Sequence, residues 1–178
     1  AALSGPQVTE VELRFAGEGD DLLRPLAAGA VMGVLEGVVG SPAVNVVNAL
    51  HLARQRGIAV NRSRVELAAE LPDLIEVKVV AGGMAVRVAG APLGAAHLRI
   101  TQIHGFRVNV APDGHLIVLQ NRDVPGVIGR VGTLLGDAGI NIAEYHQARL
   151  SAGGEALAAI GVDAAHKPEH VAALARLP

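Results

Sequence analysis

Residues 119–142, which read LQNRDVPGVIGRVGTLLGDAGINI, constrain the fold of this chain more than any other segment. An apolar strand leads into a turn at Asn121 and Asp123, and Pro125 presets the backbone just before a helix expected over residues 126–138. Apolar side chains recur along that helix at the spacing of one face, so this face should be buried. The segment therefore predicts a strand, a tight turn, an amphipathic helix and a further strand in succession.

The glycines of this segment do not match a phosphate-binding loop. Gly126, Gly129 and Gly132 follow one another at intervals of three residues, whereas a dinucleotide-binding fingerprint requires the spacing G-x-G-x-x-G. The chain also lacks the Gly-Lys-Ser/Thr sequence of a Walker loop. Nucleotide binding by this loop is therefore disfavoured.

Gly129, Gly132, Gly136 and Gly139 form a stripe along the expected helix, beside its apolar face. Each interior glycine costs a helix up to about 1 kcal/mol relative to alanine, so a line of them indicates a backbone brought close to another group. That group could be a sheet, a partner helix or a ligand. Gly139 alone has a local explanation, because glycine commonly ends a helix in the left-handed conformation.

The turn before the helix carries more specific information about function. The N–H groups of Gly126 and Val127 have no partner within the helix, and the helix dipole favours negative charge at that end. A carboxylate should therefore bind there, while Asp123 is placed to bind an ammonium group. The pattern predicts a site for a small zwitterion, with a plain helix N-cap as the alternative role of Asp123.

Composition and charge limit the possible classes of protein. A chain of 178 residues that is 51% hydrophobic and 18% charged is long enough for one large or two small globular domains. The 15 Lys and Arg against 17 Asp and Glu give a net charge of −2, and three Phe and Tyr residues offer little base stacking. We therefore expect no nucleic-acid partner.

The absence of cysteine excludes disulfides and thiolate metal sites, and it fits a reducing compartment. No apolar run is long enough for a membrane span, and no secretory signal pattern stands at the start of the sequence. We therefore expect no membrane partner and a cytoplasmic location.

The first part of the chain is typical of a mixed α+β domain in which strands outnumber helices. Residues 10–15 alternate between polar and apolar side chains, as in a half-buried strand. A long apolar helix should follow over residues 22–39. Ser41 and Pro42 then predict the start of a second helix over residues 42–56.

The rest of this part should consist mainly of strands. A short strand is expected over residues 57–60, followed by a polar connection over residues 61–73 that could be partly helical. Gly82-Gly83 predicts a two-residue hairpin turn, because both positions can adopt a positive φ, and the dipeptide at 104–105 marks a further turn between strands.

A Pro-Asp-Gly turn at residues 112–114 is the predicted boundary between domains of residues 1–113 and 114–178. Beyond it we expect a strand, a helix, two strands and a helix, at residues 116–120, 126–138, 141–150, 155–163 and 168–176. This β-α-β-β-α order is that of a ferredoxin-like split βαβ unit without its last strand. The fold class expected for the chain is therefore α+β.

Two parts of the sequence resemble one known family. LIVLQNRDVPGVIGRVGTLLGDAGINIAEYHQARLSAGGEALAAIGVD resembles the ACT domain, an amino-acid-sensing module, of the D-3-phosphoglycerate dehydrogenase family. SPAVNVVNALHLARQRGIAV and GAPLGAAHLRITQIHGFRVNV are similar to the intervening domain of its longer members, also called the allosteric substrate-binding domain. Together the two regions cover nearly the whole chain.

The resemblance implies feedback regulation by a pathway product. In this family, ACT domains pair about a two-fold axis and bind L-serine at their interface, which inhibits the first step of serine biosynthesis. By motif position, Asn121, Asp123 and Val127 would bind the amino acid from one chain, and Asn141 from the other. The implied assembly is a homodimer through the ACT domains, with a tetramer as the larger form.

The resemblance also implies an anion site in the intervening domain. Arg99, His104 and Arg107 are the candidates, since guanidinium groups and an imidazole can together bind a phosphate. The alternative is that they are solvated charges at strand ends. A second group of cations is interpreted as the solvated end of a helix, and it consists of Arg54, Arg56, Arg62 and Arg64.

The sequence offers no catalytic residues. No nucleophile is paired with a base, and no cluster of histidines or carboxylates indicates a metal site. The family's nicotinamide-binding and catalytic domains have no counterpart in this sequence. The resemblance thus implies no cofactor and no dehydrogenase activity here, with NAD as the cofactor of a parent enzyme. Two alternatives stay open: a subunit of an iron–sulfur L-serine dehydratase, and a stand-alone ACT-type module for another small amino acid.

Overall fold

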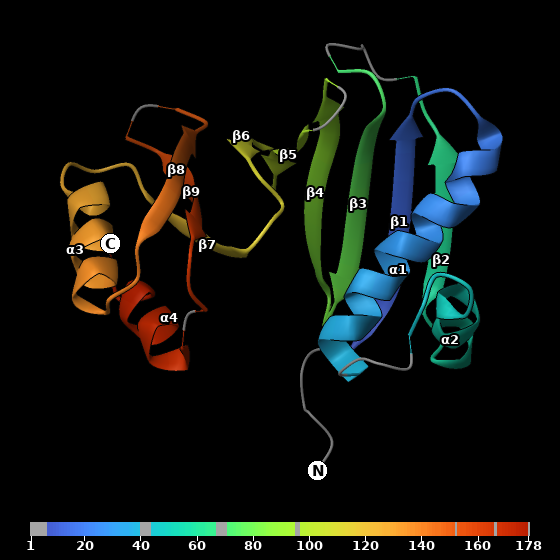
Figure 1. Ribbon diagram of the computed structural model, residues 1–178, viewed down its shortest axis with the longest axis horizontal. Helices are drawn as coiled ribbons and strands as arrows, with labels where there is room; N and C mark the ends of the chain where they lie inside the picture. The colour runs from blue at the N-terminus through green and yellow to red at the C-terminus, as the bar shows by residue number, and fades with distance from the viewer. Residues whose placement is uncertain are drawn as a thin grey trace. The chain divides into compact units, whose positions relative to one another are not determined.

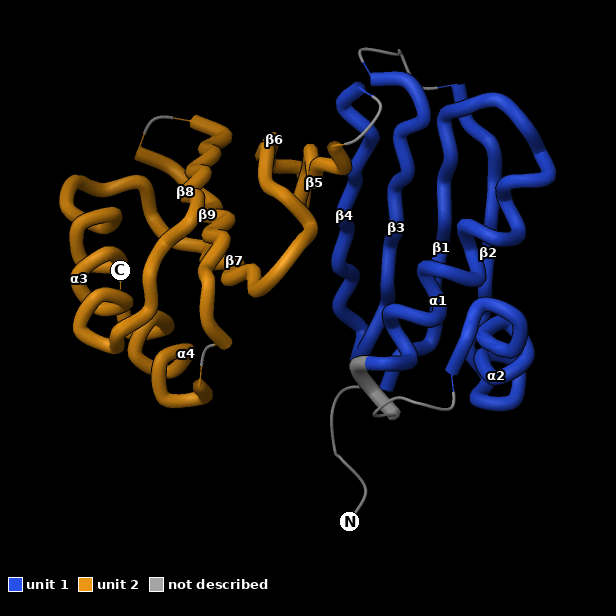
Figure 2. The backbone as a smooth tube through the Cα atoms, viewed as in Figure 1, with its two compact units in different colours: residues 1–95 blue, residues 96–178 orange. Residues whose placement is uncertain are grey.

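The computed structural model describes residues 7–39, 44–66, 71–94, 97–151, 153–165 and 167–177 of the chain. It divides into two compact units, residues 1–95 and 96–178 (Figure 2). Each unit has its own hydrophobic core. The domain boundary predicted at residues 113–114 rests on a turn rather than on packing, and it stays a prediction.

Unit 1 is a sheet with helices on one of its faces (Figure 1). Its elements are β1 (Val8–Ala16), the 3₁₀ turn η1 (Asp20–Leu22), α1 (Leu23–Val39), α2 (Ala49–Gln55), β2 (Ala59–Arg64), β3 (Leu74–Ala81) and β4 (Met84–Leu93). Within this unit the strands lie in the order β2-β1-β3-β4. β1 is parallel to β2 and antiparallel to β3, and β3 is antiparallel to β4.

The alternation along β1 determines which face of this sheet is buried. Val11 and Leu13 are each 1% exposed. Val11 packs with Val31 and Leu35 of α1, and Leu13 belongs to a cluster with Ala27 of the same helix. The half-buried strand and the long apolar helix predicted from the sequence are both confirmed.

The second helix begins later than predicted. Its first residue is Ala49, because the side chain of Asn45 accepts hydrogen bonds from the backbone N–H groups of Val47 and Asn48 at 3.0 Å each. Such a side-chain turn competes with helical hydrogen bonding. The predicted N-cap at residues 41–42 lies outside the described residues.

The polar connection expected after residue 60 is partly wrong. Residues 61–64 continue β2 and pair with β1, from Glu12 opposite Asn61 to Phe15 opposite Arg64. Most side chains of this strand are exposed, so it shows none of the alternation that reveals a half-buried strand.

Both predicted tight turns are confirmed. Gly82 and Gly83 have φ angles of 56° and 80° between β3 and β4. His104 and Gly105 repeat this geometry with φ angles of 51° and 87°. Consecutive positive φ angles are those of a two-residue hairpin whose twist matches its strands.

Unit 2 combines a hairpin with a βαββα arrangement. Its elements are β5 (His97–Ile103), β6 (Phe106–Val110), β7 (His115–Arg122), α3 (Val127–Asp137), β8 (Ile142–Arg149), β9 (Glu155–Val162) and α4 (Pro168–Leu174). β9 lies between β7 and β8 and is antiparallel to both. The α+β class is confirmed, and the described residues of this sheet include three strands.

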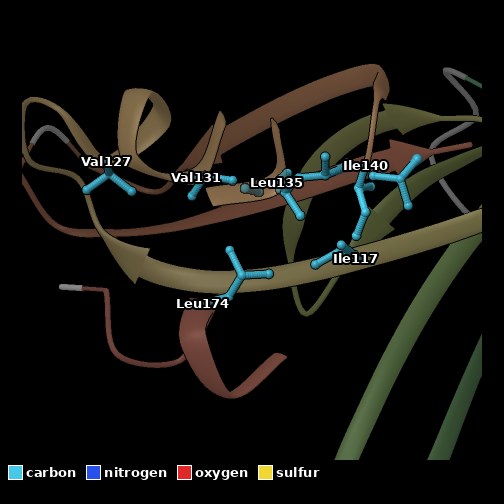
Figure 3. Packing of buried hydrophobic residues seen from close by; sticks show 9 residues of the cluster. Ile117, Val127, Val131, Leu135, Ile140 and Leu174 are labelled. Atoms are coloured by element: carbon cyan, nitrogen blue, oxygen red, sulfur yellow. The ribbon is translucent and has the colours of Figure 1, made fainter. Parts of the chain in front are cut away.

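The core of unit 2 lies between α3, α4 and one face of this sheet (Figure 3). Val131 and Leu135 of α3 are fully buried. They pack with Ile117 of β7 and Leu174 of α4 in one cluster. The apolar stripe predicted for the helix is therefore its core-facing side.

The glycine stripe of α3 points away from this core. A Cβ atom added at Gly129, Gly132 or Gly136 would meet no heavy atom of the described chain within 4 Å. The sheet of this chain is therefore not the group that the stripe approaches. A partner helix and a ligand are the two remaining explanations.

Candidate functional site

The loop between β7 and α3 borders an open pocket of about 400 Å³. Residues from three places in the sequence line it: the loop itself, the first turn of α3 and the end of β8. They are Asp123, Val124, Pro125, Gly126, Val127, Ile128, Gln147 and Arg149. A volume of this size is within the range of small-molecule sites.

Asp123 is held by the hairpin that joins β8 to β9. Its carboxylate Oδ2 accepts a hydrogen bond from Arg149 Nη1 at 2.8 Å and one from the Gly153 N–H at 3.4 Å. Its own N–H donates to the Gly154 carbonyl at 2.9 Å. The helix N-cap is Gly126, and no side chain caps the helix, so the alternative role of Asp123 as an N-cap is wrong.

The Arg149 guanidinium beside Asp123 lowers the pKa of its carboxyl below the ordinary value of 3.8, and the Gly153 N–H acts in the same direction. A lowered pKa means that the interactions of the ionised carboxylate stabilise the fold above about pH 3.8 and are lost as the pH falls through the lowered pKa. The carboxylate is therefore fully charged at neutral pH.

We predict that Arg149→Gln raises the pKa of Asp123 toward its ordinary value, because the largest cause of the lowering is removed. An NMR titration of the side-chain carboxyl carbon measures this directly. Arg122→Gln is the matched control, since it removes the same charge from the adjacent residue and should leave the pKa of Asp123 lowered. An unchanged midpoint in Arg149→Gln would contradict the pairing.

The start of α3 supplies hydrogen-bond donors to the same pocket. Gly126 has a φ of 88°, the left-handed conformation that favours glycine. Within the described chain, its N–H and that of Ile128 have no acceptor, and the Val127 N–H has only a long contact of 3.5 Å to the Val124 carbonyl. The Val127 side chain is buried in the core, so this residue can serve the site only through its backbone.

Asn121 lies on the helix-facing side of the sheet, two residues beyond the partly buried Leu119 of the core. Its Nδ2 donates to the carbonyl of Arg122 at 2.7 Å. Its Oδ1 is buried without a hydrogen-bond partner in the described part of the chain. A buried acceptor without a hydrogen bond raises the free energy of the folded chain. A donor from a bound group would remove this cost.

Asn141 is far from these residues within one chain. It is exposed and follows the C-terminal end of α3, whereas Asp123 precedes the N-terminal end. The helix between them has 11 residues, which makes it about 16 Å long. One chain therefore does not bring Asn141 to the pocket beside Asp123.

Gln147 and Arg149 line the pocket but were not among the predicted residues. They lie two residues apart on β8, so their side chains share a face of the sheet. Arg149 also shares with Asn121 a cross-strand neighbour, Ala156 of β9. Strand alternation in the sequence could have predicted that Gln147 and Arg149 share a face of the sheet. Only the pairing of β8 with β9 shows that these side chains lie beside the loop.

The predicted anion residues are differently engaged. Arg99 donates to both Oδ1 and the carbonyl of Asn109 at 2.7 Å and forms an ion pair of 2.9 Å with Glu144. His104 lies in the β5–β6 turn, and Arg107 of β6 is opposite Gln102. The charge of Arg99 is thus already neutralised by the Glu144 carboxylate. An anion site at Arg99, His104 and Arg107 stays a prediction.

Neither a metal site nor a membrane-spanning helix occurs among the described residues. No group of three or more His, Asp or Glu side chains there could hold a metal ion. None of the helices in those parts of the chain combines the length and the apolar character needed to cross a bilayer.

Comparison with known proteins agrees with this architecture. The model of the D-3-phosphoglycerate dehydrogenase intervening domain matches residues 2–104, and the model of the ACT domain matches residues 115–178. The first match alone spans more than half of the chain, and the second begins at the first residue of β7.

Individual relatives of this chain are named D-3-phosphoglycerate dehydrogenase. The chain is 36% identical over 135 residues to D-3-phosphoglycerate dehydrogenase of Bacillus subtilis, which covers 76% of this chain and 26% of that relative. It is 43% identical over 100 residues to the Archaeoglobus fulgidus enzyme of that name, covering 56% and 19%. It is 28% identical over 188 residues to the chloroplastic D-3-phosphoglycerate dehydrogenase 3 of Arabidopsis thaliana, covering 98% and 32%.

The chain thus spans between about a fifth and a third of the length of these relatives. Both of its matched regions and the βαββα order of unit 2 agree with the resemblance noted in the sequence. The chain belongs to the D-3-phosphoglycerate dehydrogenase family, of which it carries the intervening domain and the ACT domain of the regulatory part.

Proposed function

We propose that this chain is the regulatory region through which L-serine inhibits a D-3-phosphoglycerate dehydrogenase, and that the amino acid binds between two ACT domains. The observation that carries the proposal is the pocket at the start of α3, where a carboxylate and a guanidinium stand beside unused backbone donors. Few small metabolites other than amino acids carry both of the charges that such a site attracts.

The ligand's two charged groups have separate partners in this proposal. Its ammonium binds the carboxylate of Asp123, which is ionised at neutral pH because Arg149 lowers its pKa. Its carboxylate binds the N–H groups of Gly126 and Ile128, assisted by the helix dipole and by the Arg149 guanidinium. The free Oδ1 of Asn121 accepts a further hydrogen bond from the ammonium or the hydroxyl.

A second chain completes this site. Two α3 helices that pair antiparallel about a two-fold axis bring the C-terminal end of one next to the N-terminal loop of the other. Asn141 of the second chain then reaches the pocket that it does not reach in its own. The uncovered glycine stripe supports this pairing, since small residues let two helix backbones approach closely.

We predict that Gly132→Leu weakens dimerisation without harming the fold. Nothing in the described chain lies within 4 Å of a Cβ at this position, and leucine is a better helix former than glycine. A leucine in the proposed interface would hold the helices apart. Thr133→Leu is the matched control, because the exposed Thr133 is one residue away on another face of α3.

Analytical ultracentrifugation measures the monomer–dimer equilibrium of each variant directly, and a dimer equally stable in both variants would contradict the helix pairing.

The same experiment, repeated with L-serine, tests the proposed function. If two chains share each site, L-serine must shift the monomer–dimer equilibrium toward the dimer, because ligand binding and association are linked. An equilibrium that does not respond to L-serine would contradict a shared site.

The remaining parts of the proposal concern the parent enzyme. From family membership we expect that longer protein to be an NAD-dependent dehydrogenase at the first step of serine biosynthesis. We also expect it to form a larger homo-oligomer and to be located in the cytoplasm. The relatives' names support the dehydrogenase.

A further inference from the structure

Gln147 is the only uncharged polar side chain among the described residues that line the pocket at the start of α3. In the proposed function, the two charged lining residues, Asp123 and Arg149, are engaged by the ligand's ammonium and carboxylate. The remaining lining residues are apolar or glycine. Gln147 is therefore the lining residue that is left to contact a polar group on the ligand's own side chain.

Gln147 lies between Tyr145 and Arg149 on one face of the sheet, because alternate residues of β8 share a face. On one side of it, Arg149 pairs with Asp123 at 2.8 Å. On the other side, Tyr145 packs against the core of unit 2. Gln147 therefore joins the charged end of the pocket to a part of the sheet that the core holds in place.

Tyr145 fixes the orientation of the Gln147 amide. The Tyr145 hydroxyl donates a hydrogen bond to Oε1 of Gln147 at 3.2 Å. Burial raises the pKa of Tyr145 above its ordinary value of 10.0, so at neutral pH the hydroxyl keeps the proton that it donates. Nε2 of Gln147 has no acceptor within the described part of the chain. With its carbonyl oxygen occupied, the amide offers the pocket a hydrogen-bond donor.

A donor without a partner distinguishes between ligands that differ in one hydroxyl group. A hydroxyl oxygen accepts a hydrogen bond from an amide N–H, whereas a methyl group does not. A site that hydrogen-bonds a hydroxyl rejects the analogue that lacks it, because the polar group of the site is then left unpaired. Gln147 is half-buried, so it is partly shielded from the water that would otherwise replace the ligand.

We propose that Gln147 selects amino acids with a side-chain hydroxyl, by donating a hydrogen bond from Nε2 to the hydroxyl oxygen, and that Tyr145 positions it. This role rests on the proposed function, since the ligand's ammonium and carboxylate must occupy the charged end of the pocket. It adds the contact that distinguishes L-serine from L-alanine, which carries the same two charged groups without the hydroxyl.

Isothermal titration calorimetry of the full chain with L-serine and L-alanine tests this role through the ratio of the two affinities. The unchanged chain should bind L-serine about tenfold more tightly than L-alanine, the effect of one hydrogen bond. Gln147→Met keeps the length of the side chain and removes the donor. The ratio should then fall to about twofold or less, through weaker binding of L-serine.

Gln120→Met is the matched control, because Gln120 is exposed on β7 and does not line the pocket. It should leave the serine-to-alanine ratio unchanged. Tyr145→Phe tests the positioning role, since it keeps the aromatic ring in the core and removes the hydroxyl that holds the Gln147 amide. The amide can then rotate, and the ratio should fall to about threefold.

The outcomes separate this role from the proposed function. A serine-to-alanine ratio in Gln147→Met equal to that of the unchanged chain would overturn selection by Gln147 and leave serine binding intact. Absence of binding of both amino acids to the unchanged chain would contradict the proposed function itself, and the selection with it. Circular dichroism shows whether each variant folds. If Gln147→Met does not fold, an unchanged ratio in Tyr145→Phe overturns the proposal in its place.

Discussion

Leu135→Ala is expected to lower the free energy of unfolding of unit 2 by about 2–5 kcal/mol, the range for a leucine truncated in a packed core. Leu135 is 0% exposed and lies in the cluster between α3, α4 and the sheet. The loss combines the transfer of fewer apolar atoms out of water with the cavity that remains. Urea unfolding followed by circular dichroism measures it.

Leu150→Ala is the control for this experiment. Leu150 is 65% exposed, so the same truncation should change the free energy of unfolding by less than about 0.5 kcal/mol. A loss in Leu135→Ala no larger than in the control would contradict the core assigned to unit 2.

Asp123→Ala is expected to abolish measurable L-serine binding, a loss of at least about 100-fold, because removing one partner of a close charge pair is strongly unfavourable. The substitution removes the proposed partner of the ammonium group. It also leaves Arg149 without its carboxylate partner at 2.8 Å. Isothermal titration calorimetry on the variant measures the loss, and circular dichroism shows whether the fold is retained.

Asp21→Ala is the matched control, since it removes an exposed carboxylate in unit 1, which contributes no residue to the pocket beside Asp123. It should bind L-serine like the unchanged chain. Normal binding by Asp123→Ala would show that Asp123 only braces the β8–β9 hairpin through Arg149 and Gly153.

Much of the fold could be predicted because local patterns decide it. Alternation identified β1, the dipeptide Gly82-Gly83 identified a hairpin turn, and the apolar spacing of α3 identified the face that Leu135 shares. Where a single side chain redirected the backbone, the prediction failed: Asn45 forms a local turn that delays α2. The strand predicted over residues 57–60 ended too early, because the polar second half of β2 is exposed and shows no alternation.

The site could be predicted only as far as its local motif. Asp123 stood out because it precedes a helix start, but Arg149 reaches it through strand pairing across 26 positions of the chain. The four arginines of the basic group show the same limit. Arg54 and Arg62 line a cleft while Arg56 and Arg64 do not, and nothing in their spacing distinguishes the two pairs.

Calorimetric titration of the purified 178-residue chain with L-serine decides whether this chain binds that amino acid. We expect a saturable heat of binding with one amino acid bound per chain, together with a dimer in sedimentation. No heat on addition of L-serine, with a chain that sediments as a monomer, would contradict this expectation.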